Sequence, residues 1–244
     1  RAAGSTATGS PWTAAGATTD LGNHAPRSLG VAASKATSGT IDDLLGRYGR
    51  TYASELGIDV SRNTPSPLFR LLCASLLFSA RISADVAISA ARALTDTGWT
   101  TAPKMAASTW EARTKILNAA GYARYDESTS RMLGDTAAAL CRDFGGDLRQ
   151  LRQSAQRDPE AERRLLQEFK GIGGVGADIF LREVQVAWDE LYPFADKKVL
   201  RAAKRLRLGD DAQSLARHVP KKDFARLATS LVRVDLANAY GDLA

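Results

Sequence analysis

The chain has few of the residues from which metal clusters and disulfide frameworks are built. Its 244 residues include two histidines and two cysteines, Cys73 and Cys141. Two thiols so far apart in sequence supply neither a disulfide framework nor the four ligands of an iron–sulfur cluster. We therefore expect both to be buried structural thiols in a reducing compartment such as the cytoplasm, with no cofactor and no metal site.

Long apolar runs are also missing. No stretch approaches the roughly 20 apolar residues that span a bilayer, and residues 1–30 show no charged, apolar and small-residue succession typical of a secretory signal. Hydrophobic residues make up 44% of the chain, an ordinary fraction for a soluble globular protein. The composition predicts a cytoplasmic protein without a membrane partner, long enough for one or two domains.

Sustained strand alternation is the third absence. Residues 1–40 are rich in Ala, Gly, Ser and Thr, which predicts a flexible or irregular arm. Beyond them, apolar residues recur at helical spacing, between breaks such as Gly98–Pro103 and Gly145-Gly146. The pattern predicts helices over 41–56, 68–80, 86–94, 104–119, 126–144 and 148–153, and from residue 159 onward. The chain is therefore expected to be all-α.

A glycine-rich stretch lies between two predicted helices. Gly171, Gly173, Gly174 and Gly176 fall within six residues, with Val175 among them. Glycine allows close backbone approach, and the start of a helix offers free N–H groups and a dipole that favours an anion. The stretch is therefore interpreted as a phosphate-binding turn. A dinucleotide fingerprint would need a preceding strand, whereas these residues follow a helical pattern. A helix–helix turn without a ligand is the plainer alternative.

Positive charge is concentrated after residue 196. Residues 197–233 contain eleven Lys and Arg against three Asp, whereas residues 1–196 are neutral overall and the whole chain carries a net charge of +6. A basic block by itself is more often a solvated helical face. Next to a phosphate-binding turn, it favours a nucleic-acid partner.

The segment Ile172-Gly-Gly-Val-Gly-Ala-Asp-Ile-Phe resembles the hairpin of the helix-hairpin-helix DNA glycosylase superfamily, in particular the endonuclease III group. In that family the hairpin is followed by a catalytic lysine and, eighteen residues later, by a catalytic aspartate. With Gly174-Val175-Gly176 as the turn, the lysine position falls on Asp178 and the aspartate position on Asp196. The other register would put Val175 at the lysine position, so neither register supplies a lysine.

The chain departs from the family pattern at two places. Without the lysine, the Schiff base of the family's strand-cleaving members has no amine at its usual position. Many relatives also bind an iron–sulfur cluster through four cysteines near the carboxyl terminus, and this chain has no cysteine after Cys141. The resemblance therefore implies a monofunctional glycosylase without a cluster. It implies Asp196 as the catalytic carboxylate, with Asp178 as a second candidate.

Further DNA-binding candidates follow from the same resemblance. Residues 79–86 resemble the family stretch whose Gln fills the gap left by the extruded nucleotide, and Arg81 stands at the Gln position. Tyr122 and Arg124 lie where the family has a wedge loop, although a tyrosine under a turn is more often a core residue. The remaining candidates are lysines of the basic block that would hold phosphates: Lys197, Lys198, Lys221 and Lys222.

The expected architecture has two helical lobes. Residues 64–189 would form a helical barrel lobe containing the helix-hairpin-helix motif, and residues 41–63 with 190–244 a second lobe carrying Asp196. The expected function is base-excision repair by a monomer that flips a damaged base out of double-stranded DNA in the nucleoid and hydrolyses its glycosidic bond. A non-catalytic DNA-binding protein and a bifunctional enzyme with a lysine from elsewhere stay open. Residues 73–79 contain no acid, which disfavours the adenine-excising branch, whose members carry a glutamate there.

Overall fold

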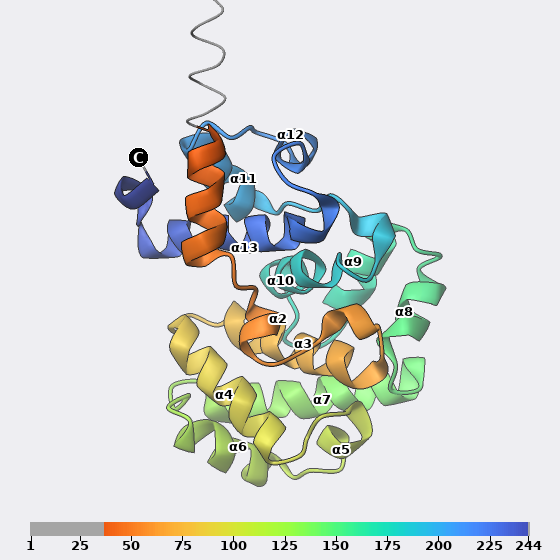
Figure 1. Ribbon diagram of the computed structural model, residues 1–244. Coiled ribbons are helices and arrows are strands. Elements are labelled where there is room, and N and C mark those ends of the chain that lie inside the picture. The colour runs from red at the N-terminus through yellow and green to blue at the C-terminus, as the bar shows by residue number, and fades with distance from the viewer. Residues whose placement is uncertain (1–36, 244) are drawn as a thin grey trace, which may run out of the picture.

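The protein is built from helices packed in two groups (Figure 1). The structure is a computed structural model that describes residues 37–243. Of the arm predicted over 1–40, residues 1–36 lie outside the described residues, whereas residues 37–40 belong to a helical segment, 37–48, with a π-helical end at Leu44–Tyr48. The α-helices that follow are α2 Tyr52–Glu55, α3 Pro65–Ser79, α4 Ala84–Asp96, α5 Ala102–Ala106, α6 Trp110–Ala119, α7 Asp126–Phe144, α8 Leu148–Ser154, α9 Pro159–Gln167, α10 Gly174–Val184, α11 Lys197–Arg205, α12 Ala212–Ala216 and α13 Lys221–Ala237. Short 3-10 turns lie at Val60–Arg62, Asp189–Leu191 and Tyr240–Leu243. With no strand among residues 37–243, the all-α prediction is confirmed.

Local signals explain most helix boundaries, and two predicted helices are each split. Asp158 caps α9 by accepting a hydrogen bond from the Ala161 N–H at 2.9 Å, and α7 ends at Gly145, whose φ is 61°. The predicted helix 41–56 breaks at Gly49, where a Cβ would come 2.3 Å from the Leu45 carbonyl oxygen. The predicted helix 104–119 is interrupted before Thr109, which caps α6.

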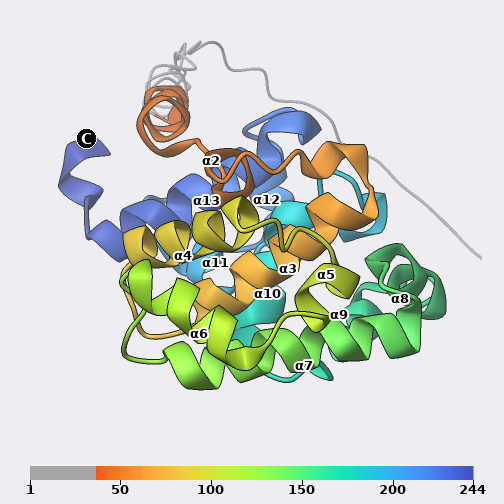
Figure 2. The same ribbon diagram turned by 90° about the horizontal axis from the view of Figure 1, so that it is seen from below.

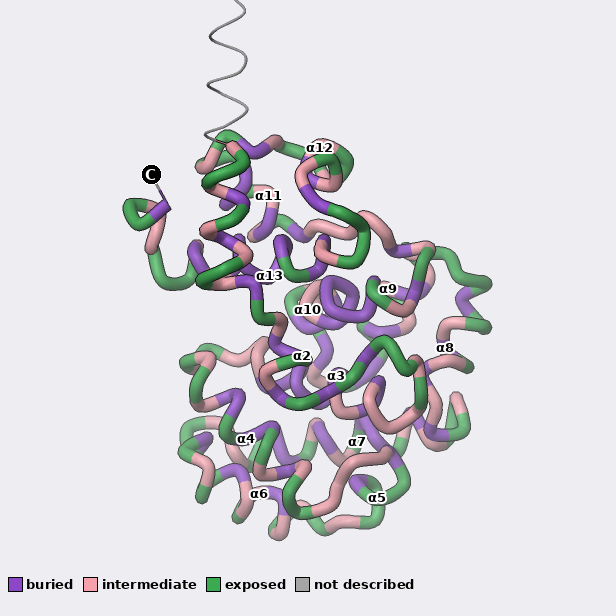
Figure 3. Tube along the Cα trace, in the orientation of Figure 1, coloured by how far each residue is buried: buried purple, intermediate pink, exposed green. Residues whose placement is uncertain are grey.

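Two hydrophobic cores correspond to the two groups of helices (Figures 1 and 3). The larger core is formed by α3 to α10 and includes the buried ring of Trp188. The smaller core joins segment 37–48 to α11, α12 and α13. Ala53, Leu56, Ile58 and Val60 pack in the larger core, although the sequence-based division placed 41–63 in the second lobe. The chain therefore crosses between the lobes near residue 50 and returns after Leu191.

The helix α10 lies at the junction of the two lobes, as Figure 2 shows from below. It packs against α3 and α9 of the larger lobe and against α13 of the smaller one. Buried Glu183 joins these parts: its carboxylate accepts hydrogen bonds from the N–H groups of Tyr52 at 3.3 Å and Ala53 at 3.0 Å, and from the Thr229 hydroxyl at 2.9 Å. A buried carboxylate with three donors is well compensated for its loss of water. It therefore ties α2, α10 and α13 together.

The two cysteines differ in exposure. Cys73 is buried in α3, where burial raises the pKa of its thiol to about 12, so this thiol is unreactive at neutral pH. Cys141 is only half-buried, contrary to the expectation that both thiols are buried. Within residues 37–243 no helix is both long and apolar enough to cross a membrane.

Candidate active site: a pocket between the lobes

A pocket of about 340 Å³ opens where the two lobes meet. That volume lies at the lower end of the range of small-molecule binding sites. Apolar side chains make up much of its wall, and its charged side chains come from α10 and from the start of α11. The residues around it include Tyr52, Phe78, Ile82, Val175, Asp178, Ile179, Arg182, Asp196, Lys197, Lys198, Val232 and Leu236.

One face of α10 supplies the larger lobe's side of the pocket. Val175, Asp178, Ile179 and Arg182 follow the i, i+3, i+4, i+7 spacing of neighbours on a helix surface. The opposite face, with Phe180 and Val184, is buried in the core. The helix therefore divides an apolar packing face from a face that presents two charged side chains to the pocket.

The glycine-rich turn connects α9 to α10 and leaves the start of α10 uncapped. No side chain accepts a hydrogen bond at the Gly173 cap position, and Gly173 and Val175 are exposed. The first N–H groups of α10 are therefore accessible to an anion. Only Gly171 needs the conformational freedom of glycine, since its φ is 90°, whereas Gly173, Gly174 and Gly176 have no positive φ. At Gly173 an added Cβ would meet nothing within 4 Å, so this position stays open for the approach of a ligand.

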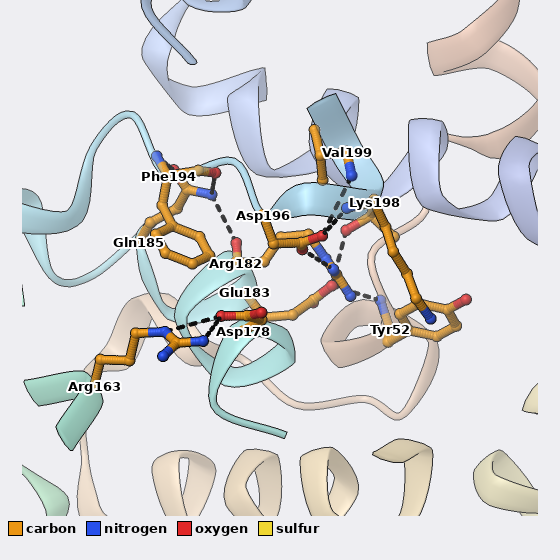
Figure 4. A network of polar contacts seen from close by, with 11 residues as sticks. Tyr52, Arg163, Asp178, Arg182, Glu183, Gln185, Phe194, Asp196, Lys198 and Val199 are labelled. Atoms are coloured by element: carbon orange, nitrogen blue, oxygen red, sulfur yellow. Dashed lines mark hydrogen bonds and ion pairs between the residues drawn. The ribbon is translucent and has the colours of Figure 1, made fainter. Parts of the chain in front are cut away.

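Asp196 lines the pocket, immediately before α11 (Figure 4). Its Oδ1 accepts hydrogen bonds from the N–H groups of Lys198 at 2.8 Å and Val199 at 3.3 Å. Its Oδ2 forms an ion pair with the Nη1 of Arg182, and both side chains are almost completely buried. The helix cap and the ion pair together hold the carboxylate in one orientation.

Asp178 lines the same pocket and is held from the larger lobe (Figure 4). Its Oδ1 accepts hydrogen bonds from Nε and Nη2 of Arg163, on α9, at 3.1 and 2.8 Å. Burial raises the pKa of Asp178 above its ordinary value, the Arg163 guanidinium opposes this rise, and the Asp196 charge adds to it. The two carboxylates that the family resemblance singled out thus line one pocket.

Three of the other predicted site residues lie at the pocket or next to it. Lys197 and Lys198 line the pocket at the start of α11, and Arg81 is exposed in the turn between α3 and α4, next to the pocket residues Ala80 and Ile82. Arg124 is exposed, with its guanidinium 5.3 Å from the centre of the Tyr125 ring.

The assignment of Tyr122 needs correction. Tyr122 is 1% exposed and its hydroxyl donates to the Leu77 carbonyl at 3.3 Å, so it is a core residue and not a wedge. Lys221 pairs with Asp189 at 2.7 Å and, with Lys222, lies about 15–17 Å along α13 from the pocket residue Val232. Phosphate binding by these two lysines stays a prediction.

Several residues of the site were not predicted from the sequence. Arg182 is the ion-pair partner of Asp196, and its buried Nε has no hydrogen-bond partner among the described residues. The Tyr52 and Phe78 rings, with centroids 4.6 Å apart, belong to the apolar wall. The sequence offered no signal for the Arg182–Asp196 pair, because the helical spacing of Asp178 and Arg182 would instead indicate a pair between those two residues, whereas Asp178 pairs with Arg163. Among the described residues, no three His, Cys, Asp or Glu side chains come together in a way that would hold a metal ion.

The arrangement of helices matches solved structures. A structure of a non-covalent endonuclease III–DNA complex superposes with a TM-score of 0.52 at 17% identity, over 83% of this chain and 84% of that one. The chain has the fold of endonuclease III. A trapped covalent endonuclease III–DNA intermediate, in an estranged-adenine complex, gives a TM-score of 0.46 at 21% identity, over 68% of this chain and 73% of that one. No protein-family model and no curated protein matches the sequence.

Proposed function

We propose that the protein is a monofunctional DNA glycosylase of base-excision repair. The observation that carries this proposal is the position of Asp196, held by hydrogen bonds in a pocket between the lobes, with the uncapped, exposed start of α10 lining the same pocket through Val175. The fold shared with endonuclease III, which its solved complexes show bound to DNA, supports double-stranded DNA as the partner. The substrate would be a damaged or modified base within that DNA.

The geometry suits hydrolysis of a glycosidic bond. A base inside the duplex is out of reach of an enzyme, so the nucleotide has to be extruded into a pocket. Breaking its bond to the sugar develops positive charge on the sugar ring, and a fixed carboxylate stabilises that charge without having to reorganise. Asp196 would fill this role. The N–H groups at the start of α10, together with Lys197 and Lys198, would hold the phosphates that flank the extruded nucleotide.

The polar lining of the pocket favours hydrolysis over strand cleavage. At position 178 the pocket presents a carboxylate held by Arg163, which cannot form a Schiff base. The amines near the pocket belong to Lys197 and Lys198, at the start of α11. Borohydride treatment during turnover should therefore trap no covalent protein–DNA adduct. An adduct that disappears in Lys198→Ala would instead establish the bifunctional alternative.

The test of the proposal is base release by Asp196→Asn. The asparagine side chain retains the ability to cap α11, so the variant should fold while losing the negative charge in the pocket. We expect base release to fall by at least 100-fold from a panel of single-lesion duplexes, and affinity for duplex to stay within a few-fold, because affinity rests mainly on phosphate contacts. Asp210→Asn, at an exposed position, is the matched control. Unchanged base release in the Asp196 variant would contradict the assignment.

A second candidate function has an observation of its own. Both Asp196 oxygens have protein partners, two N–H groups on Oδ1 and Arg182 on Oδ2, which would also suit a purely structural helix cap. In that case the protein would bind DNA without catalysis. The wild-type protein would then release no base from any duplex of the panel while still binding duplex DNA.

A further inference from the structure

The two pocket carboxylates differ in how many of their oxygens are already engaged. On Asp196, Oδ1 accepts two backbone N–H groups and Oδ2 pairs with the Arg182 guanidinium. Such a carboxylate is well placed to stabilise a neighbouring positive charge. It has little room to bind a water molecule, because three of its four lone-pair sites already accept hydrogen bonds from fixed donors.

Asp178 differs from Asp196 because only one of its carboxylate oxygens accepts hydrogen bonds. Both of its hydrogen bonds from Arg163 end on Oδ1, and no hydrogen bond reaches Oδ2 from any described residue. About a quarter of its side chain is exposed, and it faces the pocket that also contains Asp196. A carboxylate with one tethered and one free oxygen can bind a water molecule and accept a proton from it.

From this contrast we infer that Asp178 is the general base that activates the attacking water, with Arg163 as its positioning residue, while Asp196 stabilises the charge on the sugar. This inference rests on the proposed glycosylase function and divides its chemistry between two groups. Two carboxylates with separate roles on one sugar are an established solution for cleaving glycosidic bonds.

The step balances as an ordinary hydrolysis. The bond between C1′ of the sugar and the base nitrogen breaks, and its electron pair leaves with the base. The water oxygen forms the new bond to C1′ and passes one proton to Oδ2 of Asp178. The departing base takes up a proton from solvent, and Asp178 returns its own to solvent before the next turnover. No oxidant, reductant or further reactant is needed.

The surroundings of Asp178 make its protonation measurable. Burial raises the pKa of this carboxyl group, Arg163 on α9 opposes the rise, Asp196 adds to it and Arg182 on α10 lowers it. Tyr52 on α2 and Lys197 and Lys198 on α11 also line the pocket. A general base is active when deprotonated, so base release should increase with pH through the pKa of Asp178 and then level off.

The experiment measures single-turnover base release against pH, with enzyme in excess over a duplex that the wild-type protein cleaves. Asp178→Asn should slow release by at least 100-fold at the plateau and abolish the acid limb of the profile, with duplex affinity unchanged within a few-fold. Arg163→Ala removes the positive charge that opposes the rise in pKa, so its acid limb should move to higher pH. Arg163→Lys retains that charge and should leave the limb close to its wild-type position.

The outcomes separate this inference from the proposed function. Suppose that the wild-type protein releases base and that Asp178→Asn releases it equally fast with an unchanged acid limb. This result would overturn the role of Asp178 and leave the glycosylase proposal intact. An acid limb that Arg163→Ala leaves in place would also overturn it. Failure of the wild-type protein to release any base would instead refute the proposed function itself. Thermal melting of each variant confirms that it is folded.

Discussion

Glu162, in the first turn of α9, is a buried acid whose ionisation should control stability. Its side chain is completely buried, and neither carboxyl oxygen accepts a hydrogen bond from the described residues. Burial raises the pKa of Glu162 to about 8, and a hydrogen bond with Glu190 adds to this rise, since a protonated Glu162 can donate to Glu190. Glu190 also forms two 2.5 Å hydrogen bonds with Arg152, so it is the ionised member of the pair.

The size of the effect follows from the two pKa values. Glu162 has a pKa near 4.5 when exposed and about 8 in the folded protein, and each tenfold difference in proton affinity corresponds to about 1.4 kcal/mol. The folded state therefore holds a proton that the unfolded state releases between pH 4.5 and 8, and the free energy of unfolding should fall by about 5 kcal/mol across that range. Burial alone would raise the pKa of Glu190, but the Arg152 hydrogen bonds help lower it to about 2. The contribution of Glu190 is therefore complete above pH 4.5 and is lost only at lower pH.

Urea unfolding of wild type and Glu162→Gln at pH 5, 6.5, 8 and 9 measures the difference directly. Glutamine retains the shape and cannot ionise, so the variant should be the more stable protein at pH 8 and above, and the difference should shrink towards pH 5. Glu168→Gln, at an exposed position just after α9, is the control and should track wild type. A difference between Glu162→Gln and wild type that stays constant from pH 5 to 9 would refute the reasoning.

Three further predictions concern the proposed DNA-binding surface and the glycine-rich turn beside it. Gly173→Leu should weaken binding to damaged and undamaged duplex alike without loss of stability, because a Cβ at this position points into open space beside the helix start. Gly171→Ala should instead cost about 1–3 kcal/mol of stability, because residue 171 has a φ of 90° and the alanine Cβ would lie 2.8 Å from the Met132 sulfur. Equal binding by Gly173→Leu and wild type would remove the phosphate-binding interpretation of the turn. Replacing Lys197 and Lys198 with Ala should reduce the slope of log affinity against log salt by about 0.9 for each phosphate that is no longer neutralised. The same change at Lys221 and Lys222 should reduce it less, because Lys221 already pairs with Asp189. The opposite ranking of the two pairs in a salt titration would contradict the placement of the DNA-binding face.

The fold class and many helix boundaries could be predicted from the sequence, because they depend on apolar periodicity and on local signals. The all-α fold follows from apolar spacing, and α7 runs over 126–144 as predicted because Gly145 ends it. The family resemblance of the hairpin singled out two carboxylates, Asp178 and Asp196, that line one pocket. Splits within predicted helices were missed, since Gly49 and Thr109 act through close packing and caps that periodicity does not register.

Contacts between distant parts of the chain could not be predicted in this way. The partner of Asp196 is Arg182, on the preceding helix, and nothing in a one-dimensional pattern selects it from the other arginines. Tyr122 shows the same problem, because a tyrosine in a glycine-containing loop is compatible with either the surface or the core. For Glu162 a signal did exist: it precedes Leu166 by four residues, and an acid on the apolar side of a helix indicates a buried carboxyl group.

The buried Glu183 network has a consequence for how DNA would be handled. Since one carboxylate joins α2, α10 and α13, closing or opening the lobes would break hydrogen bonds to a charge that has no access to water. Movement of the lobes would therefore be costly, and under the proposed function the shape change on association would fall on the duplex. Bending a site by 40–90° takes on the order of 1–6 kcal/mol. Duplexes weakened by a nick, a mismatch or a flexible step should accordingly bind more tightly than intact ones, even where no side chain contacts the altered position.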